Sequence, residues 1–256
     1  MYSFDGRVRY SECDERGNLT LLALINYLQD CTTFHSESIG RGVSHMRGRG
    51  IAWLIAAWQI EIGRLPRFCD DIRVSTWCHS MARTLATRNF TVCDGDGIPL
   101  VRADSLWFVY DLAAGRPIRI PEDQRVYLSD EPPLDMPPTV RRLPVGGPCQ
   151  TAPAITVGEL HLDTNRHVNN AQYLGMATNA IAAVFGHDVA AHVTDIARVC
   201  IQYRRQALLA DTIVPRVHVD GGVCTVDLAD PDGDTFAVVR IELRSRGGRH
   251  AGGTGA

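Results

Sequence analysis

Two stretches of the chain repeat one pattern of residues, and this repetition constrains the fold more than any other feature. Asp14 precedes a Gly/Asn turn and an apolar run in ECDERGNLTLLALINYLQD (12–30), and Asp163 does the same, 149 residues later, in LHLDTNRHVNNAQYLGMATNAI (160–181). Further on, IEIGRLPRFCDDI (60–72) matches IQYRRQALLADTI (201–213) at an offset of 141. Because a solenoid needs more than two copies, the sequence predicts a fused pseudo-dimer of two similar domains.

Each copy predicts the same order of elements, one helix and then several strands. Apolar residues recur at helical steps in both copies, at Leu21, Leu24, Ile25, Leu28 and Cys31 and again at Leu174, Ala177, Ile181, Val184 and Phe185. Strand-like runs follow over 71–80, 84–94 and 101–112, and over 212–220, 223–230 and 235–245. A long apolar helix followed by an antiparallel meander indicates an α+β fold in which a curved sheet wraps a central helix, the hotdog arrangement, formed here twice in tandem.

Proline marks the boundary between the two copies. Seven of the 13 prolines lie between Pro132 and Pro153, a density that excludes a helix or a central strand there. We therefore predict an N-terminal hotdog domain over 1–129 and a Pro-rich linker over 130–153. A C-terminal hotdog domain should follow over 154–246, and then a disordered tail over 247–256.

Composition narrows the possible functions. The net charge of −3 is too close to zero for nucleic acid or an anionic membrane to be the main partner. All 26 basic residues are Arg, which excludes mechanisms that need a Lys amine, such as a Schiff base. The eight Cys form no C-x-x-C pair and no short Cys/His cluster, so we expect no metal site. The start MYSFDGRVRY has no apolar signal core and the longest apolar run (51–58) is too short to span a bilayer, so we expect a soluble, cytoplasmic protein.

Three polar residues alternate before the second predicted helix: Asp163, Asn165 and His167. Side chains at every second position share a face only in an extended chain, so we predict an extended approach to the helix. The helix should begin near Asn169–Asn170, because Asn is a favoured N-cap. Its positive dipole end could then stabilise an oxyanion, while a carboxylate, an amide and an imidazole activate or orient the reactants.

The first copy lacks part of this group. Its residues at the three corresponding positions are Asp14, Arg16 and Asn18, so no imidazole is present. We therefore predict a single active site, in the second copy, with the first copy supplying the walls of a substrate pocket.

These motifs resemble those of the acyl-ACP thioesterases, double-hotdog enzymes of plants and bacteria. LDTNRHVNNAQYLG (162–175) is similar to the family pattern D-x-N-x-H-V-N-N-x-x-Y, and the likeness extends over about residues 5–245. WQIEIGRLPRFCDDIRVSTWC (58–78) and IQYRRQALLADTI resemble its strand regions in the first and second halves. The resemblance implies hydrolysis of long- or medium-chain acyl-ACP to free fatty acid and holo-ACP, with no cofactor. Asp163 would be the general base or the nucleophile.

The catalytic candidates are Asp163, Asn165, His167 and Gln206. The family usually has Glu–Cys where this chain has Gln206–Ala207, which excludes a Cys nucleophile and leaves Gln206 to position water by hydrogen bonds. The candidates for substrate binding are Asn169, Asn170, Trp53, Trp58, Arg204 and Arg205. The Trp side chains would line an acyl tunnel and the Arg side chains would face an acidic carrier, although plain core and surface roles remain open for them.

Other functions compete with this one. An acyl-CoA thioesterase on the same fold fits the sequence equally well, as does a monomer or a homodimer of the pseudo-dimer. A non-catalytic acyl-thioester-binding protein should have lost Asp163 or His167, and both are present. A hotdog hydratase would show D-x-N-P-x-H, whereas no Pro follows Asn165.

Overall fold

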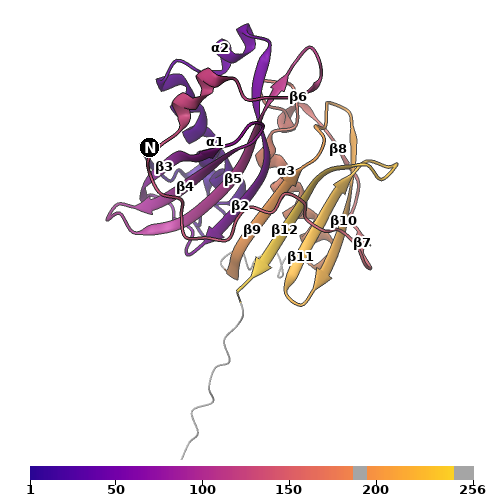
Figure 1. Ribbon diagram of the computed structural model, residues 1–256. Helices are drawn as coiled ribbons and strands as arrows, with labels where there is room; N and C mark the ends of the chain where they lie inside the picture. The colour runs from indigo at the N-terminus through magenta and orange to yellow at the C-terminus, as the bar shows by residue number, and fades with distance from the viewer. Residues whose placement is uncertain (187–194, 245–256) are drawn as a thin grey trace, which may run out of the picture.

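The computed structural model describes residues 1–186 and 195–244, and the tail predicted over 247–256 lies outside them. Helices α1 (Leu21–Ser38) and α3 (Asn170–Phe185) lie together behind one curved sheet, and the short helix α2 (Val43–Gly48) follows α1 (Figure 1). The strands are β1 (Tyr2–Arg7), β2 (Ile51–Ile62), β3 (Asp71–Met81), β4 (Ala86–Asp94), β5 (Pro99–Asp111), β6 (Arg116–Ile118), β7 (Gln150–Thr151), β8 (Ile155–Thr156), β9 (Ile196–Tyr203), β10 (Thr212–Asp220), β11 (Val223–Ala229) and β12 (Thr235–Leu243). No helix in this described part is long and apolar enough to cross a membrane.

The sheet is built from two half-sheets that join edge to edge. Its strand order is β1-β3-β4-β5-β2-β9-β12-β11-β10-β7, with β6 on β5 and β8 on β10. The halves meet where β2 pairs with β9, from Ala57 opposite Gln202 to Glu61 opposite Arg198. Each half wraps its own long helix, which confirms the predicted α+β fold of two tandem hotdogs.

The duplication is visible in the backbone. The bridge between Cys13 and Leu19 recurs between Leu162 and Val168, and the bridge between Asn18 and Arg67 recurs between His167 and Leu208. Backbone strain repeats as well, because Cys69 and Ala210, which are equivalent at the offset of 141, both have φ of 69°. The two offsets seen in the sequence therefore relate structurally equivalent residues.

The core is continuous across the two copies. Buried side chains of α1, α3 and both half-sheets form one cluster, in which Leu24, Leu28 and Leu174 are each at most 1% exposed. The two helices approach closely at Gly175, where an added Cβ would lie 3.1 Å from Leu22 Cδ1. Burial of this shared apolar surface is the main force that holds the copies together.

The Pro-rich segment between the copies crosses the sheet to β7 (Figure 1) and is bound along its path. Trp77 Nε1 donates to the Pro132 carbonyl (3.0 Å), Thr139 Oγ1 donates to Asp104 Oδ2 (2.6 Å), and Arg204 Nη2 donates to the Leu143 carbonyl (3.1 Å). These partners come from β3, β5 and the residue after β9, so the segment spans the joint between the two half-sheets. It acts as a strap that satisfies polar groups on the sheet.

Candidate active site

The loop before α3 is a tight turn around Asp163. Asp163 Oδ1 accepts from the backbone N–H groups of Asn165 (2.7 Å) and His167 (3.2 Å), and Oδ2 accepts from the Asn165 amide (3.2 Å). Arg166 has φ of 62°, a left-handed conformation that closes the turn. The predicted extended stretch is therefore wrong: the carboxylate bonds the backbone ahead of it, as Asp does in turns, and this outcompetes an extended chain.

The first copy contains the same turn. Asp14 Oδ1 accepts from the N–H groups of Arg16 (2.9 Å) and Asn18 (2.8 Å), and Gly17 has φ of 78° at the position of Arg166. Both Asp side chains thus hold a loop in shape. What distinguishes the second loop is the chemistry it carries, an amide in place of Arg16 and an imidazole in place of Asn18.

Gln206 lies on the segment next to the imidazole. His167 bridges to Leu208, and the N–H of Val168 donates to the Ala207 carbonyl (2.9 Å), so the turn and the segment after β9 run side by side. Within the described chain the His167 ring makes no hydrogen bond, which leaves its nitrogens available for a substrate. The structure thus brings His167 close to the segment that carries the exposed Gln206.

Two tyrosines fix this segment to α3. The Ala207 N–H donates to Tyr173 Oη (2.9 Å), and Tyr203 Oη donates to the Asn170 carbonyl (3.0 Å). Burial raises the pKa of Tyr173 to about 12, so the phenol stays neutral. Tyr173 is 2% exposed, so it both packs in the core and anchors the backbone beside Gln206.

Helix α3 begins where the sequence predicted. Asn169 is its N-cap and accepts from the Ala171 N–H (2.9 Å). Gln29 of α1 bonds both Asn side chains, donating to Asn169 Oδ1 (3.3 Å) and accepting from Asn170 Nδ2 (2.8 Å). The positive end of the α3 dipole therefore lies beside the turn, held by a side chain from the other copy.

A second side chain of the first copy reaches the turn itself. Arg47 of α2 donates from Nη2 to Asn165 Oδ1 (2.5 Å) and to the Thr164 carbonyl (3.2 Å). Sequence reasoning found neither Gln29 nor Arg47, because no local pattern indicates a contact across more than 100 residues.

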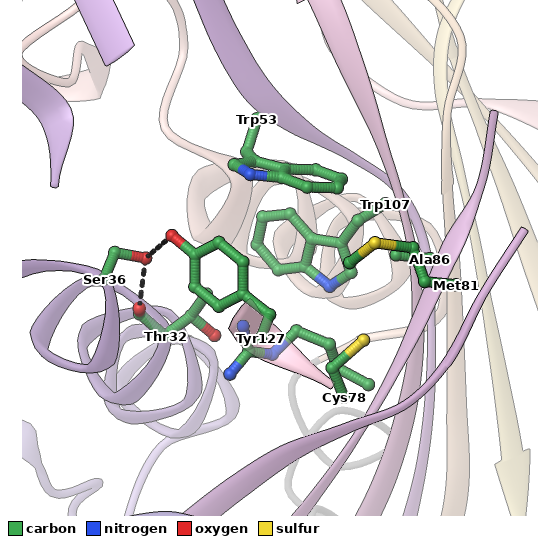
Figure 2. A pocket seen from close by; sticks show the side chains of 9 residues that line it. Thr32, Ser36, Trp53, Cys78, Met81, Ala86, Trp107 and Tyr127 are labelled. Carbon is green, nitrogen blue, oxygen red and sulfur yellow. Dashed lines mark hydrogen bonds between the residues drawn. The ribbon is translucent and has the colours of Figure 1, made fainter. Parts of the chain in front are cut away.

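A cavity in the first copy is walled by aromatic rings. Figure 2 shows Trp53, Trp107 and Tyr127 gathered around it, with Ser36 of α1 on one side and Met81 of β3 on the other. Its volume of about 30 Å³ equals one water molecule's share of the liquid. An acyl chain would therefore enter only if these rings move.

Trp53 and Trp58, predicted together as tunnel residues, have different surroundings. Trp53 lines this cavity and donates to Gln124 Oε1 (2.9 Å). Trp58 is 1% exposed, packs against Phe90 (5.0 Å between ring centroids) and lies behind the cavity wall against Trp107 (6.3 Å), without lining the cavity itself.

The cavity also holds a buried cation that the sequence did not single out. Arg88 of β4 is 5% exposed, donates to Thr76 Oγ1 (3.3 Å) and to His35 Nδ1 (2.6 Å), and lies over the Tyr127 ring (5.4 Å). Burial, and then the Arg88 charge, lower the pKa of His35 to about 4. His35 is therefore neutral at pH 7 and accepts through Nδ1, so its Nε2 carries the proton.

Arg204 and Arg205 differ in surroundings as well. Arg204 lines a shallow surface groove with Arg141, Arg142 and Gln202. Arg205 is held by Asp230 (2.5 Å) and stacks over the Phe236 ring (4.2 Å). Arg204 thus belongs to a basic surface, whereas Arg205 is largely engaged within the fold.

Comparison with known proteins matches this architecture. The family model for the acyl-ACP thioesterase N-terminal domain matches residues 2–127, and that for the C-terminal domain matches residues 150–244. An oleoyl-acyl carrier protein thioesterase of Arabidopsis thaliana is 27% identical over 76% of this chain, and an acyl-[acyl-carrier-protein] hydrolase of Cuphea viscosissima is 24% identical over 91%. The chain spans 59% of the length of each of these relatives.

Solved structures show the same fold. A crystal structure of an acyl-ACP thioesterase from Bacteroides thetaiotaomicron aligns with a TM-score of 0.83 at 23% identity, covering 94% of this chain and 97% of that one. The 12:0-ACP thioesterase from Umbellularia californica aligns with a TM-score of 0.79 at 22% identity, covering 95% and 96%. With both domain models matched in order over most of the sequence, this chain belongs to the acyl-ACP thioesterase family.

Proposed function

We propose that this chain hydrolyses acyl thioesters at the turn before α3, and that its substrate is a medium- or long-chain acyl group carried by ACP. One observation carries the proposal. The same turn occurs twice, and only the sequence of the second turn places Asn165 and His167 next to Asp163. This second turn lies beside the N-terminus of α3 and beside the segment that carries Gln206. Family membership and the relatives named as acyl-ACP hydrolases support the reaction class.

The geometry suggests separate tasks for the two carboxylate oxygens of Asp163. Oδ1 already accepts from two backbone N–H groups, whereas among residues 1–186 and 195–244 Oδ2 accepts from the Asn165 amide alone and can accept from a water as well. We propose that this water attacks the thioester carbon, or that Oδ2 attacks it directly. With water as the nucleophile, Asp163 takes the water proton, a C–O bond forms, the C–S bond breaks, and the thiolate takes a proton from His167, which Asp163 then replaces. With Oδ2 as the nucleophile, the C–S bond breaks to give the thiol and an acyl–Asp163 anhydride, and a water then hydrolyses the anhydride to the free acid.

The developing oxyanion would be stabilised by the start of α3. A helix N-terminus presents N–H groups and a partial positive charge, and an electrostatic site of this kind acts most strongly on charge that appears in the transition state. Gln206 would orient the attacking water by hydrogen bonds, because a neutral amide cannot remove a proton.

We assign the acyl chain to the aromatic cavity of the first copy, enlarged by movement of its rings, and the carrier to the basic groove. Trp53, Trp107 and Tyr127 provide apolar walls for the chain. The groove lined by Arg141, Arg142 and Arg204 offers positive charge to an acidic carrier protein. CoA would present its own phosphates to the same charges, so the carrier must be identified by experiment.

The test is release of free thiol from panels of acyl-ACP and acyl-CoA that differ in chain length. Wild type should turn over acyl-ACP faster than the matching acyl-CoA, and His167→Ala should lose at least about 100-fold in kcat/KM. Faster turnover of acyl-CoA would identify CoA as the carrier. Wild-type rates in His167→Ala would refute the proposed site.

A further inference from the structure

The turn that carries the candidate catalytic residues is held from outside its own copy. We propose that Arg47, on α2 of the first copy, is a positioning residue of the active site that fixes the orientation of the Asn165 amide and so the surroundings of Asp163 Oδ2. This inference rests on the proposed function.

The hydrogen bonds form a chain with one direction. Arg47 Nη2 donates to Asn165 Oδ1 at 2.5 Å, and Asn165 Nδ2 donates to Asp163 Oδ2 at 3.2 Å. A guanidinium can only donate, so it selects the orientation in which the amide oxygen faces Arg47 and the NH₂ group faces Asp163. The second N–H of Asn165 Nδ2 is then left for the water or for the thioester carbonyl.

Without Arg47 this selection would weaken. Asn165 is exposed, so water could solvate either end of its amide, and the side chain could leave Asp163 or rotate its oxygen toward the carboxylate. The turn itself would persist, because two backbone N–H groups still bond Asp163 Oδ1. The loss should therefore appear in the chemical step and not in folding.

Helix α2 is a fixed support for this contact. Met46, the neighbour of Arg47, is 4% exposed and packs in the cluster that includes Tyr127 and the partly buried Trp53 of the cavity wall. The guanidinium is thus presented from an anchored element, although Arg47 and Asn165 are themselves exposed. Because an exposed polar contact contributes little to folding, its effect on stability should be small.

A second contact of this kind reaches the same loop. Gln29 of α1 bonds Asn169 and Asn170 across the copies, whereas Thr178, its counterpart 149 residues later, bonds the Gly175 carbonyl within its own helix. Gln29 and Arg47, both from the first copy, thus contact the loop of the second copy that carries His167. This convergence distinguishes the Arg47 contact from general surface packing.

The experiment compares Arg47→Ala and Arg47→Lys with Arg49→Ala, a matched control. Arg49 follows the same helix but pairs with Asp123 at 2.6 Å. With the acyl-ACP that wild type hydrolyses fastest, Arg47→Ala should lower kcat about 10- to 100-fold with KM changed less than about 2-fold. Arg47→Lys should recover part of kcat because an ammonium can donate to the same oxygen, and Arg49→Ala should match wild type.

A double-variant test shows whether Arg47 acts through Asn165. In the Asn165→Ala background, Arg47→Ala should lower kcat by less than about 2-fold, because the amide it positions is gone. Additive losses, or an Arg47→Ala variant with full kcat and unchanged thermal unfolding, would overturn the inference. If Asn165→Ala and His167→Ala kept full turnover as well, the proposed function would fail too. If Asn165→Ala and His167→Ala lost turnover while Arg47→Ala did not, the proposed function would hold and the inference about Arg47 would fail.

Discussion

Because the turn is duplicated, a matched pair of substitutions can distinguish a structural role of the Asp side chain from a catalytic one. Asp14→Asn and Asp163→Asn change the same atom in the same setting, since each carboxylate accepts two backbone N–H groups and one side-chain amide. Asparagine keeps the Oδ1 acceptor but loses the charge, and its NH₂ group meets the NH₂ group of Asn18 or Asn165. Both variants should therefore lose similar stability.

The size of that loss follows from the contacts. A hydrogen bond to a charged group contributes about 1.5–3 kcal/mol and a neutral one about 0.5–1.5 kcal/mol; one of the three bonds is lost and two become neutral, so each variant should lose about 3–5 kcal/mol. In a chain of this length a loss of that size lowers Tm by about 6–20 °C. The activities should differ widely: Asp163→Asn should lose about 100- to 10,000-fold in kcat/KM, while Asp14→Asn should stay within about 2-fold of wild type.

Thermal unfolding and thiol release from acyl-ACP measure both quantities on the same preparations. Equal losses of activity in the two variants would show that Asp163 acts only through the shape of the turn. Wild-type turnover in Asp163→Asn would refute the catalytic role outright.

Three further predictions concern groups around the site. Because the pKa of His35 is about 4 in the folded protein and near 6.5 unfolded, the unfolded chain takes up a proton first as the pH falls. Up to about 2.5 kcal/mol of stability should thus be lost by pH 4.5. Urea unfolding should show this loss in wild type and in exposed His45→Gln but not in His35→Gln, and an equal loss in His35→Gln would contradict it. Tyr173→Phe leaves the buried Ala207 N–H without its acceptor and should cost about 1–3 kcal/mol in urea unfolding, with a lower kcat; unchanged stability would speak against the anchor. Asp104→Ala removes the acceptor of Thr139 under the strap and should speed proteolysis within 130–145 about 10-fold, whereas unchanged cleavage would mean that the strap is held elsewhere.

Much of the fold was predictable because its signals are local. Helical periodicity located α1 and α3, and strand-like runs located β3, β4 and β5 in the first copy and β10, β11 and β12 in the second. The N-cap at Asn169 followed from residue type alone. These features depend on burial of one face of each element, which leaves a period in the sequence.

The turn at Asp163 was misjudged because a period of two also fits three polar residues that bend around one carboxylate. The sequence of the first copy contains a residue that indicates a turn at this position. Gly17 stands where the second copy has Arg166, and both have positive φ. An Asp followed three residues later by Gly is typical of a turn, and the duplication carries that turn into the second copy.

Contacts between the copies could not be predicted. Gln29 and Arg47 contact the second copy, and Arg88 contacts His35 within its own copy, so each acquires its role only when residues far apart in the chain meet. Proline density excluded a helix or a central strand from the segment between the copies but gave no sign that the segment binds the sheet or supplies β7 at its edge. Asn89 and Asp104 are buried polar residues on strands with apolar neighbours, and they bond the segment between the copies. Their polar side chains are a sequence signal of this contact.

The proposed function requires that one of the two equivalent turns forms a single active site. The most direct measurement is calorimetric titration of the chain with an acyl-ACP analogue whose thioester is replaced by a non-hydrolysable amide. One analogue should bind per chain, and its binding should be weakened by substitutions at the second turn and unaffected by Asp14→Asn. Two equivalent analogues per chain would contradict it.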